Sequence, residues 1–351
     1  MKHFSTAASM LGALLLAAGW GSCAYAVELG ESVEMHGYGH LGFLKTDANR
    51  YLKAGTEGTW QYRDLALLFT GKLNDRSKAW VQLYGSEGKV RVDWAFVDYQ
   101  LAIGPTLQFG QIKLPLGIYN ETRDVEFIRP SSMRPFLYQD AAEISDEAYR
   151  GVGLLHDHDL GGGSMSWNVY AGRIAEFEAD HPHNHKGLVG VRAVYRTPVD
   201  GLSVMVSAYD SQIEMKESGE AGHKRVTVLS LDHVRGDLDL KAEYGRKSAF
   251  GETAETWYGQ AAYTFGEKWT PYLRYDYVTT DRANRANRAD PSFYQRSTVL
   301  GLGYKFSANV GLRLETHINH GYAMPVAAEE VEAGAGETDW NMTVFSLNFI
   351  F

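Results

Sequence analysis

The chain has 351 residues, of which 21 are tyrosine, 37 glycine and 9 proline, and its formal net charge is −9 at pH 7. This acidic balance argues against nucleic acid as a partner, because nucleic-acid-binding domains are usually basic. Beyond residue 26, no apolar run is long enough for a transmembrane helix. The chain is therefore expected to be periplasmic, secreted or a barrel crossing the outer membrane with strands, and its tyrosine- and glycine-rich composition favours the barrel.

Residues 1–26 have the pattern of a Sec signal peptide. Lys2 precedes an apolar run over residues 11–19, and Ala24-Tyr25-Ala26 offers small residues for cleavage near Ala26. The mature chain would then be residues 27–351. The single cysteine, Cys23, would be removed with the signal, which leaves no disulfide or thiol nucleophile. A lipoprotein interpretation is less favoured, because the residues before Cys23 lack the usual Leu-Ala-Gly pattern.

Alternating apolar and polar residues predict about sixteen strands along the mature chain. In residues 237–246, for example, Leu238 and Leu240 share one face, while Asp239 and Lys241 share the other. Ionised groups are costly in hydrocarbon, so they should face a lumen. The predicted strands are Glu34–Leu44, Tyr62–Lys72, Lys78–Tyr84, Val90–Leu101, Thr106–Lys113, Arg150–His158, Met165–Ile174, Leu188–Arg196, Leu202–Ile213, Arg225–Val234, Asp237–Arg246, Thr256–Phe265, Trp269–Thr280, Arg296–Phe306, Gly311–His320 and Asn341–Phe351.

The connections between these strands alternate in length. Brief turns such as "NDRS" and "RGD" separate longer loops, although "GSEGK" is short for its place. Short turns on one side and long loops on the other are typical of an up-and-down antiparallel transmembrane β-barrel. A barrel of about sixteen strands is too wide for its side chains to fill, so its lumen should hold water. Trp94, Trp257, Tyr304 and Trp340 are expected to face outward in the interfacial aromatic girdles.

The last nine residues, "TVFSLNFIF", place Phe345, Leu347, Phe349 and Phe351 on one face. This ending resembles the C-terminal insertion signal of bacterial outer-membrane proteins. The alternative is an ordinary final strand of a soluble sheet.

The third outward loop, residues 114–149, follows neither a helical nor a strand period. Pro130 and Pro135 reduce the entropy lost when the loop becomes ordered. Its apolar residues can anchor it to the inner wall of the barrel; they are Phe127, Ile128, Met133, Phe136 and Leu137. We therefore expect the loop to fold inward and narrow the lumen, the alternative being a solvated lid over the barrel mouth.

At this loop the chain resembles the Gram-negative porins, whose third loop folds back into the barrel and narrows it. The segment "GQIKLPLGIYNETRDVEF" from Gly110 looks like the strand-to-loop passage of the phosphate-selective porin group, and "YRGVGL" from Tyr149 looks like the strand that follows. This closer likeness covers about fifty residues, whereas the porin architecture covers the mature chain. The resemblance implies a homotrimer. The chain has no dense lysine run, and this departure argues against phosphate specificity.

Charged residues predicted to face the lumen form the candidate selectivity site. The site comprises Arg91, Lys113, Asp124, Glu126, Arg129, Arg134, Arg150, Arg192, Arg196, Arg274 and Arg313, with Asp93, Asp239, Glu243, Asp276 and Glu315 interspersed on the wall. A basic wall opposite an acidic loop resembles general diffusion porins. The predicted function is passive diffusion of small hydrophilic solutes or ions, without a cofactor. An anion- or phosphate-selective channel is one alternative, and a non-conducting structural or adhesin barrel is another.

Two further features have simpler interpretations. His181, His183 and His185 on the fourth outward loop are weak candidates for zinc or copper ligands, but a solvated loop is the commoner interpretation, and no metal is predicted. The arginines of "DRANRANRAD", residues 281–290, are candidates for binding lipopolysaccharide phosphates, again with a solvated loop as the alternative. An enzyme is not predicted, because neither Gly-x-Ser-x-Gly nor His-Glu-x-x-His occurs.

Overall fold

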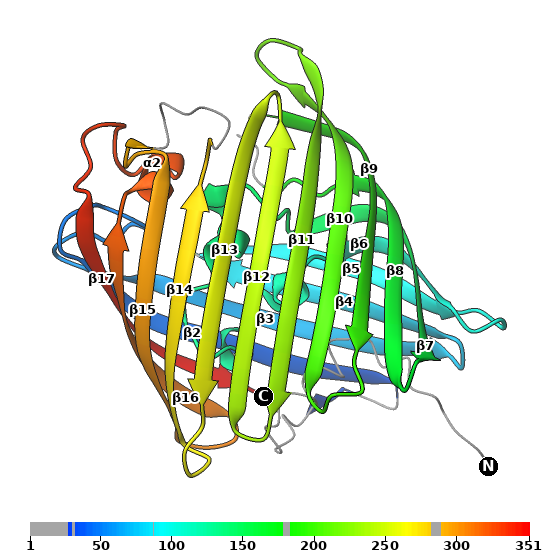
Figure 1. Cartoon of the computed structure of the whole chain (residues 1–351). Coiled ribbons are helices and arrows are strands. Elements are labelled where there is room, and N and C mark those ends of the chain that lie inside the picture. Colours follow the sequence, from blue (N-terminus) through cyan, green and yellow to red (C-terminus); the bar gives the residue numbers. More distant parts are fainter. Residues whose placement is uncertain (1–26, 30–31, 87, 178–182, 282–288) are drawn as a thin grey trace.

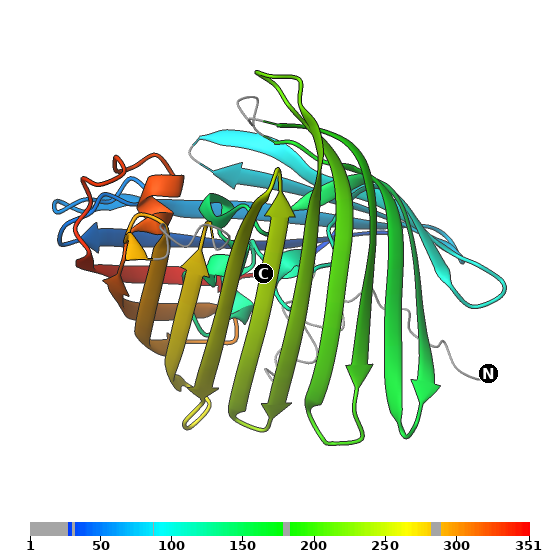
Figure 2. The same cartoon turned by 45° about the horizontal axis from the view of Figure 1, so that its top comes forward.

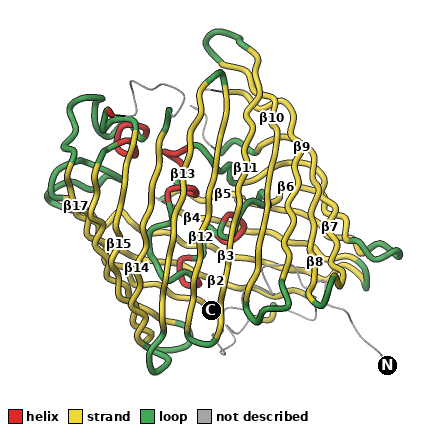
Figure 3. The backbone as a smooth tube through the Cα atoms, viewed as in Figure 1, coloured by secondary structure: helices red, strands yellow, loops and turns green. Residues whose placement is uncertain are grey.

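The structure is a computed structural model that describes residues 27–29, 32–86, 88–177, 183–281 and 289–351. The predicted signal peptide lies outside the described residues. Sixteen antiparallel strands, β2 to β17, each pair with the next, and β17 pairs with β2, so the sheet closes into a barrel (Figures 1 and 3). A two-residue strand, β1 (Val27–Glu28), adds to β2. The predicted all-β barrel fold is confirmed.

Each predicted strand corresponds to one observed strand. The observed strands are β2 (Val33–Thr46), β3 (Thr59–Asn74), β4 (Ser77–Ser86), β5 (Lys89–Gln100), β6 (Thr106–Lys113), β7 (Ala148–Leu160), β8 (Gly163–Ile174), β9 (His183–Arg196), β10 (Leu202–Met215), β11 (Ala221–Arg235), β12 (Leu238–Ala249), β13 (Glu252–Tyr263), β14 (Trp269–Thr279), β15 (Tyr294–Lys305), β16 (Val310–His320) and β17 (Asp339–Ile350). Among the described residues, no helix is long and apolar enough to cross a membrane.

The expected contrast between short turns and long loops is only partly correct. We call the end of the barrel that carries the connections 75–76 and 236–237 the turn end, and the opposite end the loop end. At the loop end, residues 216–220 and 250–251 are also short connections. The reason is that β10, β11, β12 and β13 extend into the segments expected to be loops, and the hairpin of β10 and β11 rises at the top of Figure 1.

Alternation along the strands separates an apolar outer face from a polar inner face. On β11, Leu229 and Leu231 are 51% and 43% exposed, whereas Val228, which precedes them, and Ser230, which lies between them, are buried. On β9, Val191 is exposed and Arg192 is buried. Exposed apolar side chains on one face are what a barrel in lipid requires, and Arg192 lies on the other face, as expected.

The predicted aromatic girdle is only partly correct. Trp257 is 43% exposed and its ring centroid lies 5.3 Å from that of Tyr275, and Tyr304 packs against Trp269 with ring centroids 4.4 Å apart. Trp94 and Trp340, in contrast, are buried. A bulge where β4 pairs with β5 reverses the alternation and turns Trp94 inward.

Trp340 faces inward as well. It shares the face of β17 that carries the buried residues Met342 and Val344, and its indole nitrogen donates to the Gly321 carbonyl oxygen over 3.0 Å. The predicted outward position of Trp340 is therefore wrong, because Trp340 has the opposite parity to the outward-facing Phe345 on the same strand.

The connection between β6 and β7, residues 114–147, lies inside the barrel (Figure 2), and we call it the inner loop. It contains four single-turn 3-10 helices, η1 (Asn120–Thr122), η2 (Glu126–Ile128), η3 (Phe136–Tyr138) and η4 (Asp140–Ala142). The remaining helix of the described chain, α2 (Ala323–Ala327), lies in the connection between β16 and β17. The inward fold of the third loop was expected from the sequence.

Candidate functional site

The two ends of the inner loop, near Leu114 and Glu147, are hydrogen-bonded to each other where they join β6 and β7, and we call this region the neck. The backbone N–H of Leu114 donates to the Glu147 carbonyl oxygen over 3.0 Å. The side-chain amide of Asn120 donates to the carbonyl oxygens of Leu114 and Asp146, both over 2.9 Å. These bonds join the two ends of the loop, so the whole segment projects into the lumen as one unit.

One side of the inner loop binds the wall formed by β10, β11 and β12. The Glu243 carboxylate on β12 accepts hydrogen bonds from the backbone N–H of Ile118, over 2.8 Å, and from the Tyr138 hydroxyl. The Tyr209 hydroxyl on β10 donates to the Ile144 carbonyl oxygen over 3.2 Å. Lys224 on β11 forms an ion pair of 2.9 Å with Asp146. A carboxylate, a hydroxyl and an ammonium on three neighbouring strands therefore hold this side.

The other side of the inner loop binds β14, β16 and β17. Arg274 on β14, which is fully buried, donates to the Ser131 hydroxyl over 2.6 Å and to the Met133 carbonyl oxygen over 2.9 Å. Glu315 on β16 accepts from the backbone N–H of Met133 over 2.8 Å. The Tyr62 hydroxyl of β3, which lies opposite β10 and β11 in the closed sheet, donates to the Ser132 carbonyl oxygen over 3.0 Å, so the inner loop crosses the lumen.

Glu126 is the buried acidic centre of this second attachment. Its side chain is 1% exposed and lies 3.2 Å from Arg313 of β16 and 3.5 Å from His40 of β2. Ser346 of β17 also donates to it, and the Tyr62 hydroxyl of β3 donates over 3.0 Å. Burial alone would raise the pKa of Glu126, but His40 and Arg313 hold that pKa below its usual value. The carboxylate is therefore ionised at neutral pH and links the loop to four strands.

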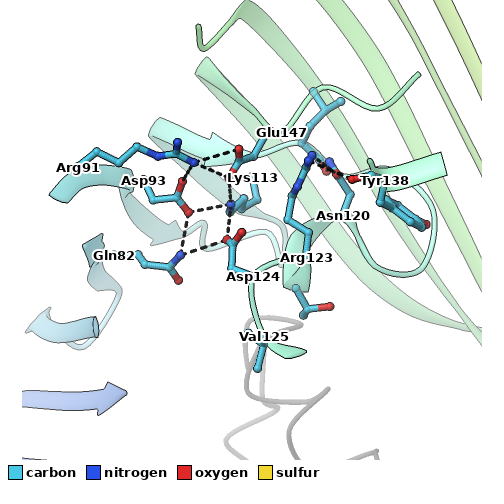
Figure 4. A network of polar contacts seen from close by, with 12 residues as sticks. Gln82, Arg91, Asp93, Lys113, Asn120, Arg123, Asp124, Val125, Tyr138 and Glu147 are labelled. Carbon is cyan, nitrogen blue, oxygen red and sulfur yellow. Dashed lines mark hydrogen bonds and ion pairs between the residues drawn. The ribbon is translucent and has the colours of Figure 1, made fainter. Parts of the chain in front are cut away.

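A second charged cluster closes the neck of the loop (Figure 4). The Lys113 ammonium lies 2.7 Å from Asp93 and 2.6 Å from Asp124, and it also pairs with Glu147. Arg91 lies 3.2 Å from both Asp93 and Glu147. Burial opposes ionisation, yet Lys113 holds the pKa of Asp124 below its usual value and that of Glu147 well below it.

This cluster also contains the three-carboxylate grouping in which a metal ion could be sought. One oxygen from each of Asp93, Asp124 and Glu147 lies within 4.8 Å of the others. The Lys113 ammonium sits among those oxygens and contacts all three side chains. The cation that the carboxylates surround is therefore a side chain of the protein itself.

Several predicted selectivity residues lie on the inner face but are bound to the loop. Arg192 pairs with Glu121, Arg274 donates to Ser131 and Met133, and Arg313 pairs with Glu126. Asp124 and Glu126 are nearly inaccessible in the same way, and Arg129 is buried within the loop, donating to the Arg123 carbonyl oxygen over 2.7 Å. The expectation that these charges face open water is corrected, because each is used to hold the loop in place.

Arg150 is the clearest error among the predicted site residues. It is exposed, donates to Gln111 over 2.7 Å, and shares the outward parity of Val152, which is 43% exposed. Tyr149 takes the inner position instead and is fully buried. The flanking glycines, Gly151 and Gly153, hid the parity, because a strand with glycine at alternate positions does not indicate which face is apolar.

Three predicted cations keep contact with water on the inner side. The side chains of Arg91 and Arg134 are 37% and 27% exposed. Arg196 is exposed near the turn end and donates to the Ser166 hydroxyl over 2.6 Å. These are the predicted site arginines that stand in solvent inside the barrel.

The histidine candidates are not gathered on a loop. His183 and His185 belong to β9, where His183 stacks on Phe250 at 5.6 Å and His185 is buried 3.1 Å from the Ser211 hydroxyl. The expected loop position is wrong because β9 begins at His183. His181 lies outside the described residues, as do residues 282–288 of the predicted lipopolysaccharide segment.

The sequence did not indicate which charged residues of the inner loop form ion pairs. Arg123 is buried and donates to the Tyr138 carbonyl oxygen over 3.1 Å while pairing with Asp140. Glu121 and Glu147 pair with wall cations. Their only signal in the sequence was a dense run of charges without a period, which indicates no particular partner.

A cavity of about 860 Å³ lies below the inner loop at the turn end. Ile118, Phe127 and Ile128 of the loop form its roof. Its wall carries both signs of charge, including Arg196, Lys241, Asp232 and Asp239. The turn-end half of the barrel is thus a wide vestibule that narrows at the loop.

No protein-family model matches the chain, and no curated protein is similar to it in sequence. Solved structures do resemble it. The outer membrane channel DcaP of Acinetobacter baumannii has a TM-score of 0.63 at 12% identity, covering 93% of this chain and 99% of that one. An anion-selective porin from Comamonas acidovorans has a TM-score of 0.62 at 12% identity, covering 91% and 99%.

OmpF of Salmonella typhi, in a complex with daunomycin, has a TM-score of 0.61 at 13% identity and covers 93% of this chain and 100% of that one. At such identities the likeness concerns the fold, which here extends over nearly the whole of each compared chain. The closed sixteen-stranded barrel is therefore similar in fold to this channel and these two porins.

Proposed function

We propose that the protein is a porin of the bacterial outer membrane, through which small hydrophilic solutes or ions diffuse passively. The observation that carries this proposal is the inner loop, which crosses a wide, charge-lined barrel and is held there by buried ion pairs on opposite walls. A barrel of this strand number encloses water unless something fills it. The loop is the element that narrows the path, so it limits the size of the solutes that pass.

Ion preference in this proposal depends on the cations that remain in water. Arg91 and Arg134 are partly exposed, while Asp140 beside Arg134 is 78% exposed. Both signs of charge are present, so selectivity should be weak and should decrease as salt screens the charges. Strong anion or phosphate selectivity would need exposed arginines along one track, and three of the predicted wall arginines, Arg192, Arg274 and Arg313, are instead bound to the loop.

The second candidate is a non-conducting structural or adhesin barrel. It is favoured by the same loop contacts, because strands on both sides of the lumen, β3 and β10, bind the segment. Conductance in planar lipid bilayers separates the two candidates. A porin gives discrete current steps that scale with salt, whereas the structural barrel gives none although it inserts into the bilayer.

A homotrimer and contacts with outer-membrane lipid and lipopolysaccharide belong to the same proposal. The outward pair Arg150 and Arg173, which lie directly opposite each other on β7 and β8, supports the lipid contact, since phosphate groups would relieve their mutual repulsion. Chemical crosslinking in native membranes tests the trimer. Bands no larger than the monomer would contradict it.

A further inference from the structure

A second, smaller cavity lies in the inner wall between β4 and β9. Its volume is about 100 Å³, and Arg192 and Val194 line both this cavity and the vestibule. An enclosed cavity of roughly 150 Å³ holds a benzene ring. The side cavity alone is smaller than this, so a solute of one ring would extend from it toward the vestibule, with which it shares lining residues. We call it the side cavity.

Three aromatic residues form one side of the side cavity. Trp80 and Phe96 stack with ring centroids 6.0 Å apart and planes 12° apart, and Trp94 lies 5.5 Å from Phe96. The bulge in β5 places Trp94 on the same side as Phe96. Aromatic pairs gain energy in offset or edge-to-face contacts, so this wall favours a solute with a flat ring.

Buried polar atoms around the cavity lack partners within the described chain. They are the indole nitrogen Nε1 of Trp94, the amide oxygen Oδ1 of Asn168 and the guanidinium nitrogen Nε of Arg192. Two are donors and one is an acceptor. Leaving a buried donor or acceptor unsatisfied costs free energy, so a solute that supplies both an acceptor and a donor at its edge is favoured here.

The charged groups around the side cavity already have hydrogen-bond or ion-pair partners. Asp98 accepts from the Trp80 indole N–H and from the Gln108 amide, both over 2.9 Å. Lys113 has its three carboxylates, and Arg192 has Glu121. Because a buried ion needs an opposite charge that this cavity does not offer, an uncharged solute is preferred over an ionic one.

We propose that the side cavity is a binding site for a small, uncharged, planar aromatic solute that carries a hydrogen-bond acceptor and a donor at its edge, such as an aromatic amide. The proposal rests on the proposed porin function and names a class of solute that binds transiently to the inner wall. Its ring packs on the Trp94 and Phe96 side, its carbonyl oxygen accepts from Trp94, and its N–H donates to Asn168.

The test is isothermal titration calorimetry of the folded protein in detergent micelles at neutral pH. The probe is benzamide, compared with benzoate, which is charged, and cyclohexanecarboxamide, which is not planar. Removing one neutral hydrogen bond weakens binding by roughly 2- to 12-fold. We therefore expect Trp94→Phe and Asn168→Leu each to weaken benzamide binding by about that factor, and we expect both comparison compounds to bind more weakly than benzamide.

Trp257→Phe is the matched control. Trp257 faces outward and is 43% exposed, so this variant should bind benzamide with the affinity of the unaltered protein. Its titration also shows how much heat comes from partition of benzamide into the micelles. Equal benzamide affinity for Trp94→Phe and the unaltered protein would overturn the proposal, as would benzoate binding as tightly as benzamide. Heat-modifiable migration on a gel identifies folded barrels for every variant.

The result is distinguishable from a failure of the porin function. Conductance without specific benzamide binding overturns the side cavity and leaves the porin standing. Specific benzamide binding without conductance supports the side cavity and overturns the porin.

Discussion

Neutralising Glu126 should loosen the inner loop without dissolving the barrel. The change Glu126→Gln leaves the buried Arg313, whose side chain is 5% exposed, without its carboxylate partner at 3.2 Å, and His40 loses its own at 3.5 Å. Breaking a buried ion pair costs about 3–5 kcal/mol. Because the glutamine oxygen can still accept a hydrogen bond, we expect the lower end, about 3 kcal/mol, which is roughly a 100-fold increase in loop opening.

Amide hydrogen exchange measures this opening residue by residue. Protection of the Arg129 N–H, which donates to the Glu126 carbonyl oxygen over 3.0 Å, should fall by roughly 100-fold, while amides of the paired strands β11 and β12 keep theirs. Asp140→Asn is the matched control in the same loop. The Asp140 side chain is 78% exposed, and its partner Arg123 keeps a hydrogen bond to the Tyr138 carbonyl oxygen, so this change should open the loop less than Glu126→Gln does. The reasoning would be refuted if the Arg129 N–H lost equal protection in Glu126→Gln and Asp140→Asn, or if it lost none in Glu126→Gln.

Three further predictions follow from the same charges. The pKa values of Asp124, Glu126 and Glu147 are lowered in the folded protein. The stability that these carboxylates contribute is therefore present above the ordinary carboxyl pKa of about 4 and is lost as pH falls through the lowered values. Opening of the inner loop, measured by amide hydrogen exchange, should increase in acid, and an opening equilibrium independent of pH would contradict this. The double variant Arg91→Gln/Arg134→Gln should shift the reversal potential toward cation selectivity, whereas Arg150→Gln, at an outward-facing position, should not shift it. Equal shifts in the double variant and in Arg150→Gln would contradict the placement of Arg91 and Arg134 along the water-filled path. Lys113→Met leaves three carboxylates without their central cation and should destabilise the neck by about 3–5 kcal/mol, so the yield of heat-modifiable barrel should fall well below that of Arg150→Gln.

The barrel was predictable because a strand that separates lipid from water must alternate. Leu229 and Leu231 lie outside and Ser230 lies inside for this reason, and the sixteen predicted segments fall on the observed strands. Two of the errors occur where alternation is interrupted. The bulge in β5 turns Trp94 inward, and the glycines beside Arg150 remove the side chains that would have indicated its face.

The attachments of the inner loop were not predictable in the same way. Glu126 meets Arg313 across 187 positions of sequence, and Arg274 meets Ser131 across 143. No local pattern encodes such pairs, since they depend on where the loop ends up inside the closed barrel. Apart from Arg150, charge parity indicated which wall arginines face inward, but it could not distinguish those that contact water from those that hold the loop.

Single-channel conductance of the unaltered protein and of a deletion of residues 126–139, measured in planar bilayers, tests the central claim most directly. Heat-modifiable migration first establishes that the deletion variant forms a barrel. If the inner loop narrows a water-filled channel, the unaltered protein gives discrete steps and the folded deletion variant gives larger ones. Steps of equal size in the two proteins, or no steps in either, would contradict the account.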